Sequence, residues 1–195
     1  MTKGEQTRQR IIAEAAPIFN QRGFAGCSMQ DIMDATGMEK GGLYRHFSSK
    51  EELAVESLRY ALAKAVRSRT EKVEEIQGAV EKLRHLIRHF VESPSVIPGG
   101  CPLMNTAIDS DDGNPALRAL ACDGIQVWKT RLCRILEAGI ERGEIGERVL
   151  PRQIANTIIA TLEGALMISR LEGTQTALED AHHSLDDLLS GLATS

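Results

Sequence analysis

Three basic side chains, Lys40, Arg45 and Lys50, stand at five-residue intervals near the N-terminus of the chain. Lysine and arginine neutralise nucleic-acid phosphates, and they also donate hydrogen bonds to the edge of guanine. Gly41 and Gly42 would let the backbone between the first two approach base edges or thymine methyl groups closely. We therefore expect contacts with double-stranded DNA, with Lys40 and Arg45 reading bases. The alternative is a solvated basic face.

Local signals place these residues among short helices. The hydroxyl of Ser28 can cap a helix in which Asp31 reaches back to complete a capping box. Gly37 is suited to end that helix in a left-handed conformation. A tight turn and a second short helix follow, and a serine–glutamate capping signature at residues 48–52 opens the next helix. Two helices joined by a glycine-containing turn, over about residues 28–47, predict a helix-turn-helix whose second helix enters the major groove.

Residues 7–53 resemble the N-terminal domain of the TetR family of bacterial repressors. The resemblance rests on an ordered string of residues: Ile11, Ile12, Ala15, Ala16, Ile18, Phe19, Arg22, Gly23, Phe24, Ser28, Asp31, Ile32, Ala35, Gly37, Lys40, Gly41, Leu43, Tyr44, His46, Phe47, Lys50 and Leu53. It implies a DNA-binding transcriptional regulator in which Tyr44, His46 and Lys50 grip phosphates. Repression rather than activation is likewise implied by the family alone.

Two positions depart from the usual family pattern. Glu39 stands where serine is common, and Gly42 where threonine, serine or alanine is common. An acid suits the first turn of a helix but repels nearby phosphate, and a second glycine costs roughly 1 kcal/mol of helix propensity. The operator preference of a relative therefore cannot be transferred. The candidate DNA-binding residues are Ser28, Glu39, Lys40, Gly41, Gly42, Tyr44, Arg45, His46 and Lys50.

The rest of the chain is also expected to be helical, which predicts an all-α fold of about nine helices. Apolar spacing and proline or glycine signals place helices at about residues 7–21, 29–35, 39–45, 50–76, 80–91, 103–109, 115–143, 151–171 and 176–192, with a loop over 93–100. Pro17 lies inside the first of these helices and predicts a kink there. Leu43 and Phe47 are expected to be core; Tyr44 is either core or a phosphate contact.

Two domains are expected, a DNA-binding domain over residues 5–65 and a larger helical domain over residues 66–195. The resemblance implies that the larger domain dimerises and holds a small-molecule inducer. The helix over about residues 151–171 is apolar over more of its circumference than a surface helix needs, and the last helix carries a second apolar seam. We therefore expect a four-helix interface between subunits. The alternative is intramolecular core. The proposed dimer residues are Ile154, Ile158, Leu162, Ala165, Leu178, Leu185 and Leu189.

The inducer site is predicted from mixed polar and apolar residues after the main loop and on neighbouring helices. This candidate set consists of Phe90, Cys101, Met104, Asn105, Ile108, Trp128, Arg131 and Met167. Cys101 could instead sense oxidants or electrophiles, provided that it is exposed near a helix N-terminus. Ordinary packing is the alternative reading for each residue in the set.

Composition excludes several other classes of protein. The net charge of −4 divides into +2 over residues 1–50 and −6 over the remainder, so the basic excess lies with the motif. The cysteines show no paired spacing, and His85 and His89 lack a third ligand, so no metal or cofactor is expected. No signal peptide or membrane span is evident, which predicts a cytoplasmic protein. A small helical enzyme and a protein-interaction module without DNA function remain the alternatives.

Overall fold

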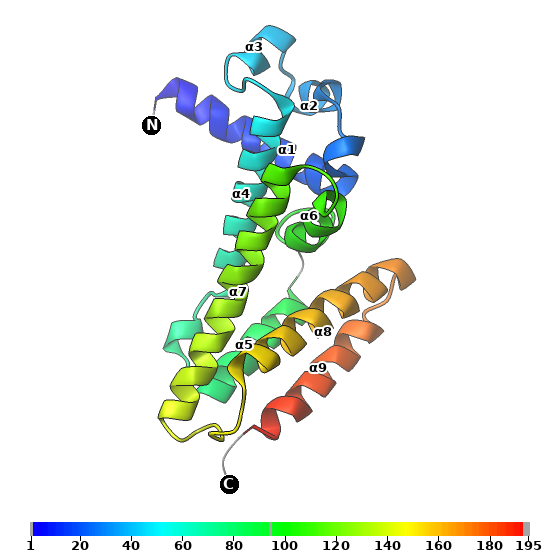
Figure 1. Cartoon of the computed structure of the whole chain (residues 1–195). Coiled ribbons are helices and arrows are strands. Elements are labelled where there is room, and N and C mark those ends of the chain that lie inside the picture. The colour runs from blue at the N-terminus through cyan, green and yellow to red at the C-terminus, as the bar shows by residue number, and fades with distance from the viewer. Residues whose placement is uncertain (1, 94, 193–195) are drawn as a thin grey trace. The chain divides into compact units, whose positions relative to one another are not determined.

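The structure, a computed structural model, describes residues 2–93 and 95–192. Over these residues the chain forms nine α-helices, one 3-10 helix and no strand (Figure 1). The helices are α1 (Lys3–Gly26), α2 (Met29–Thr36), α3 (Lys40–Tyr44), α4 (Lys50–Arg69), α5 (Ala79–Glu92), α6 (Pro102–Ser110), α7 (Pro115–Glu141), α8 (Pro151–Glu172) and α9 (Thr176–Ser190), and the 3-10 helix is Val73–Glu75. The predicted all-α fold is confirmed.

Two helices differ from their predicted form. In α1 the residue that leaves helical backbone geometry is Gly23, with φ 71° and ψ 172°, and not Pro17. Glycine adopts this φ without a steric penalty, so the chain turns there. The fourth helix was expected to continue to about residue 76, but α4 ends at Arg69. Lys72 then takes a positive φ of 62° and leads into the 3-10 helix.

The helices pack into two compact units that are each discontinuous in sequence. The first unit contains Met1–Val66 and Ser95–Gly124, and the second contains Arg67–Pro94 and Ile125–Ser195. The predicted domains were continuous, with everything after residue 65 in one domain. The difference is that α6 and the first turns of α7 fold with the N-terminal helices.

The first unit is built around α1. Its core contains Ile11, Ile32, Leu43, Phe47 and Leu53, all fully or almost fully buried. Leu43 and Phe47 are therefore core residues, as predicted. Because the core takes one face from each of α1 to α4, the opposite faces of α2 and α3 are left for contacts outside the chain.

The second unit is a core of α5, α7, α8 and α9, and it corrects the predicted dimer residues. Ile158, Leu162, Ala165, Leu178, Leu185 and Leu189 are at most 7% exposed and pack in this core, and Ile154 is half-buried against it. These side chains fill the interior of one chain, which was the alternative reading. A dimer surface on α8 or α9 must use the faces that point outward.

The outward face of α8 is partly apolar. Met167 is 43% exposed, Ile168 41% and Leu171 80%, and a Cβ atom added at Gly164 would meet no atom within 4 Å. In the described part of the chain, α8 is also the one helix long and apolar enough to cross a bilayer by length and composition. A helix that packs one face in a protein core can have the same length and composition, and α8 does pack in the core of the second unit.

Candidate nucleic-acid interface

Helix α2 starts on the predicted capping box. The Ser28 hydroxyl accepts a hydrogen bond from the Asp31 amide (3.1 Å), and the Ser28 amide donates to the Asp31 carboxylate (2.7 Å). Gly37 ends the helix with φ 61°, as predicted. Arg22 forms an ion pair with Asp31 and so fastens the end of α1 to the start of α2. The Ser28 hydroxyl also donates to Asp31, so any phosphate contact there must share this side chain.

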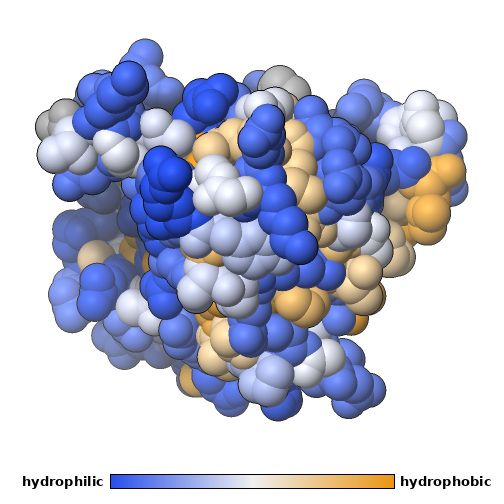
Figure 2. Space-filling model, turned by 90° about the horizontal axis from the view of Figure 1, so that it is seen from above, coloured by the Kyte–Doolittle hydropathy of each residue, from blue (hydrophilic) through white to orange (hydrophobic). Residues whose placement is uncertain are grey.

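Helix α3 presents short and basic residues on its exposed side. Lys40, Gly41 and Arg45 are exposed, and neither Lys40 nor Arg45 forms an ion pair within the residues that the structure describes. A Cβ at Gly41 would meet nothing within 4 Å, so this surface is open to a close approach. Figure 2, a view from above relative to Figure 1, shows mainly hydrophilic residues in blue, with apolar residues in orange among them.

Four other predicted DNA-binding residues lie in α3 or directly beside it. Tyr44 is 43% exposed, which rules out the core alternative for its ring. His46 is half-buried, and Glu39 is the exposed N-cap residue of α3 with no side-chain capping bond. At Gly42, an added Cβ would lie 3.0 Å from the terminal methyl of Met38, a flexible group.

Lys50 opens α4 and rests on an aromatic ring. Its ammonium nitrogen lies 4.3 Å from the centroid of the Phe24 ring, a cation–π contact that orients the side chain. The sequence placed Lys50 at a helix start but missed Phe24 as its support. The sequence signal for this contact was the Arg22-Gly23-Phe24 string, because a turn at a glycine can direct the ring that follows it toward a neighbouring helix.

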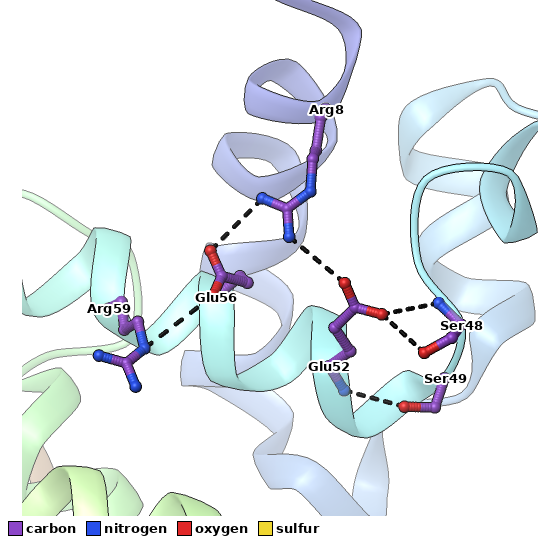
Figure 3. A network of polar contacts seen from close by, with 6 residues as sticks. All are labelled: Arg8, Ser48, Ser49, Glu52, Glu56 and Arg59. Atoms are coloured by element: carbon purple, nitrogen blue, oxygen red, sulfur yellow. Dashed lines mark hydrogen bonds and ion pairs between the residues drawn. The ribbon is translucent and has the colours of Figure 1, made fainter. Parts of the chain in front are cut away.

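A polar network that sequence reasoning missed holds α4 to α1. Arg8 on α1 contacts the carboxylates of Glu52 and Glu56, each at 3.4 Å (Figure 3). Glu52 also accepts hydrogen bonds from the Ser48 amide and hydroxyl, while its own amide bonds the Ser49 hydroxyl. The predicted capping signature is thus split between two serines. The hydrogen bonds from Ser48, followed by the interaction with Arg8, lower the pKa of the Glu52 carboxylate.

Helix α6 is hydrogen-bonded to α1 within the first unit. The Asn105 side chain donates to the backbone oxygens of Asn20 (3.0 Å) and Gly99 (2.9 Å). The Asp109 carboxylate accepts from the Phe24 amide at 2.8 Å, next to the turn at Gly23. A Cβ at Gly23 would lie 2.6 Å from that carboxylate, so the turn and the acid are fitted to each other.

The predicted inducer residues do not all belong to one unit. Cys101, Met104, Asn105 and Ile108 lie in the first unit, and Phe90, Trp128, Arg131 and Met167 in the second. Ile108 is 68% exposed and Met167 43%, so neither is enclosed as a pocket-lining residue would be. Asn105 is committed to the α1–α6 hydrogen bonds. Phe90 and Trp128 do pack together, with ring centroids 5.7 Å apart.

The hypothesis that Cys101 senses oxidants required an exposed thiol, and the Cys101 thiol is buried. Cys101 is the N-cap residue of α6 but is only 1% exposed, so an oxidant in solvent cannot reach its sulfur in this conformation. Cys27, next to Ser28, is equally buried, and burial raises the pKa of its thiol. Both thiols are small core groups here.

The two histidines at metal-ligand spacing have other partners. The His85 and His89 rings stack with centroids 6.0 Å apart, and each ring is hydrogen-bonded, His85 to the Glu71 carbonyl and His89 to the Ser93 hydroxyl. Among the described residues, no group of three or more His, Cys, Asp and Glu side chains could hold a metal ion.

The start of α2 should be pH-sensitive. Hydrogen bonds from Ser28, followed by Arg22, lower the pKa of Asp31 to about 2 from its ordinary 3.8. The stabilisation by the charged form is therefore complete above the ordinary pKa and is lost as the pH falls through about 2. We expect Asp31→Asn to have a lower Tm than the wild type at about pH 6, and the difference to shrink toward about pH 2. Thermal melts across this range test it; a constant difference would contradict the prediction.

The fold and the exposed basic helix define a helix-turn-helix DNA-binding regulator, and comparison with known proteins identifies its family. The family described as "Bacterial regulatory proteins, tetR family" matches residues 11–56, and "Tetracyclin repressor-like, C-terminal domain" matches residues 79–185. The chain therefore belongs to the TetR family of transcriptional regulators. The predicted resemblance is confirmed, and the alternative of an enzyme is set aside because this family is a class of regulators.

Similar proteins cover most or all of the chain. A TetR transcriptional regulator from Chloroflexus aurantiacus J-10-FL has 41% identity and a TM-score of 0.94, covering 99% of this chain and 98% of its own. A TetR-family regulator from Cytophaga hutchinsonii has 34% identity and a TM-score of 0.93, covering 100% and 98%. The HTH-type transcriptional repressor DhaR from Mycobacterium sp. (strain GP1) is 25% identical, over 88% of this chain and 86% of its own.

Proposed function

We propose that this regulator is a homodimeric repressor that binds a palindromic operator and leaves it when a small molecule binds. The observation that carries the DNA contact is the exposed surface of α3, where Lys40 and Arg45 have no ion-pair partner among the described residues. The similarity to a repressor over most of both chains favours repression. The site of action would be the cytoplasm, where the DNA is.

Base reading is assigned to the α3 surface. Lys40 and Arg45 would donate to guanine edges, and Gly41 and Gly42 would admit the backbone to the groove. Glu39, at the N-cap, would disfavour a phosphate near it and so limit how α3 enters the groove. Ser28, Tyr44, His46 and Lys50 would position the domain on phosphates without reading sequence.

A two-fold operator calls for a two-fold protein. The recognition helices of the two subunits must then be separated by about one duplex turn, roughly 34–36 Å. The exposed apolar residues of α8, Met167, Ile168 and Leu171, supply a surface that a second copy would cover. The buried residues of α8 and α9 cannot do so.

Release by an inducer requires a ligand that binds better to the arrangement that does not fit DNA. A coupling of 1–3 kcal/mol corresponds to a change of about 5- to 150-fold in operator affinity. Asn105 of α6 donates a hydrogen bond to α1, and Asp109 of α6 accepts one from it. A ligand that moves α6 would therefore disturb the packing of the DNA-binding helices.

Substitutions that separate base reading from phosphate binding test the proposal. Lys40→Ala and Arg45→Ala should each cost about 1–3 kcal/mol on the preferred operator and relax base preference. Lys50→Ala should weaken binding to all sequences alike and reduce the dependence of affinity on salt. The operator is first selected from genomic fragments, and affinities are then measured at several salt concentrations. If the two classes of variant behaved identically, the division into base-reading and phosphate-binding residues would be wrong.

The matched control is Arg67→Ala. Arg67 is an exposed arginine near the end of α4, outside the helix-turn-helix. Its removal changes the net charge by the same amount as the test substitutions, so unchanged base preference in this variant shows that position matters. No detectable affinity of the wild type for any fragment at low salt would overturn the proposed function.

A further inference from the structure

An arginine covers two stacked aromatic rings in the second unit. The Phe90 and Trp128 rings are tilted by 19° with centroids 5.7 Å apart. The guanidinium carbon of Arg69, the last residue of α4, lies 4.2 Å from the Phe90 centroid and 5.6 Å from the Trp128 centroid. Phe90 is 6% exposed, while Arg69 and Trp128 are half-buried. The three side chains form one cluster that is partly exposed to solvent.

Arg69 has no carboxylate partner in the described residues. The ion pairs of the second unit involve Lys82, Arg84 and Arg142 instead. Half-buried charges usually have a counter-ion, because desolvation disfavours an isolated charge. A guanidinium that stacks on a ring through its face still has its edge N–H groups free to bind an anion.

A second arginine lies on the same side of α7. Arg131 follows Trp128 by three residues, which places the two side chains on neighbouring positions of one helix face. It is also half-buried and has no ion pair among the described residues. Arg131 therefore places a second positive charge on the face of α7 that carries Trp128.

We propose that Arg69, Phe90 and Trp128 bind a small organic acid, with its carboxylate on the edge of Arg69 and its apolar part against the rings. Arg131 would add a second positive charge. A cationic ligand is disfavoured, because it would have to displace Arg69 from the ring faces and would meet Arg131. The inference rests on the proposed function in one respect, that this acid would be the inducer.

The sole tryptophan of the chain makes the site directly observable. Benzoate and octanoate are titrated into the DNA-free protein at constant ionic strength while Trp128 fluorescence is recorded, with calorimetry as a second readout. We expect a saturable change with both acids, and at least about tenfold weaker binding of benzamide and benzyltrimethylammonium, which lack the carboxylate. No saturable signal with either acid up to its solubility limit overturns the proposal, as does equal binding of benzamide.

Variants locate the site. Arg69→Met retains an unbranched apolar chain but no charge, and it should weaken benzoate binding at least about tenfold with an unchanged circular dichroism spectrum. Arg67→Met, two residues earlier and exposed, is the matched control and should bind benzoate as the wild type does. Should Arg69→Met alter the fold, Arg69→Lys provides the second test, because it preserves the charge and should retain part of the affinity. Wild-type affinity in Arg69→Met overturns the proposal.

Acid binding and operator release are measured in separate experiments. Titration of the DNA-free protein tests the site itself, and operator affinity in saturating benzoate tests the role of inducer. Failure of the site and failure of the proposed regulation are therefore distinguishable.

Discussion

Ile168→Glu is expected to convert the protein to a monomer and to reduce operator affinity at least about 100-fold. Ile168 is 41% exposed on the outward face of α8, beside Met167 and Leu171. A glutamate there would place two like charges in an apolar interface, where they cannot be solvated. Because a dimer holds both half-sites at once, a monomer loses the gain in effective concentration that linkage provides.

Analytical ultracentrifugation gives the assembly state, and binding to single and paired half-sites gives the operator affinity. Val127→Glu is the control, since Val127 is also exposed, at 54%, but lies on α7. It should remain dimeric. If Ile168→Glu stays dimeric at the concentrations at which the wild type does, the outward face of α8 is not the interface.

In the interior of the second unit, Gly139→Ala should lower the free energy of unfolding by about 1–3 kcal/mol. In an ordinary helix the same change would stabilise the protein by up to about 1 kcal/mol. Here the added Cβ would lie 2.6 Å from the Cβ of Ala79 and 2.7 Å from Cδ1 of Ile145. Ala79 and Ile145 are both fully buried, so neither neighbour can move away freely.

Denaturant unfolding measures this effect. Gly26→Ala is the control, because the nearest atom to its added Cβ is Arg22 Cβ at 3.8 Å, an ordinary contact. The double variant Ala79→Gly, Gly139→Ala should recover part of the loss, since it removes the closest atom. Wild-type stability or better in Gly139→Ala would contradict the close packing of α7 against the start of α5.

Local sequence signals placed most helix ends correctly. Ser28 and Gly37 bound α2, and Pro115 and Pro151 open α7 and α8, because capping and proline geometry depend on neighbours along the chain. The same signals failed at Pro17 and at the end of α4. Proline keeps helical dihedrals there, and the chain turns at Gly23, where the carboxylate of the distant residue Asp109 meets the backbone.

The candidate DNA-binding site was likewise predictable from the sequence only in part. The residue types around α3 indicated DNA, since basic, aromatic and glycine residues at helix-turn-helix spacing are recognisable in one short stretch. Their supports were not predictable from that stretch: Phe24 under Lys50, and Arg8 joined to Glu52, are contacts between helices. No periodicity within one helix specifies which side chain of another helix will meet it.

The amino-acid sequence alone was enough to predict the helical class, the helix-turn-helix motif and the family, because caps, turns and motif spacing depend on a few neighbouring positions. Packing decided which face of α8 is interior, that residues 95–124 fold with the N-terminal helices, and that Arg69 covers Phe90 and Trp128. An apolar residue is equally suited to a core and to a subunit interface. Only the positions of the other helices determine which of the two it occupies.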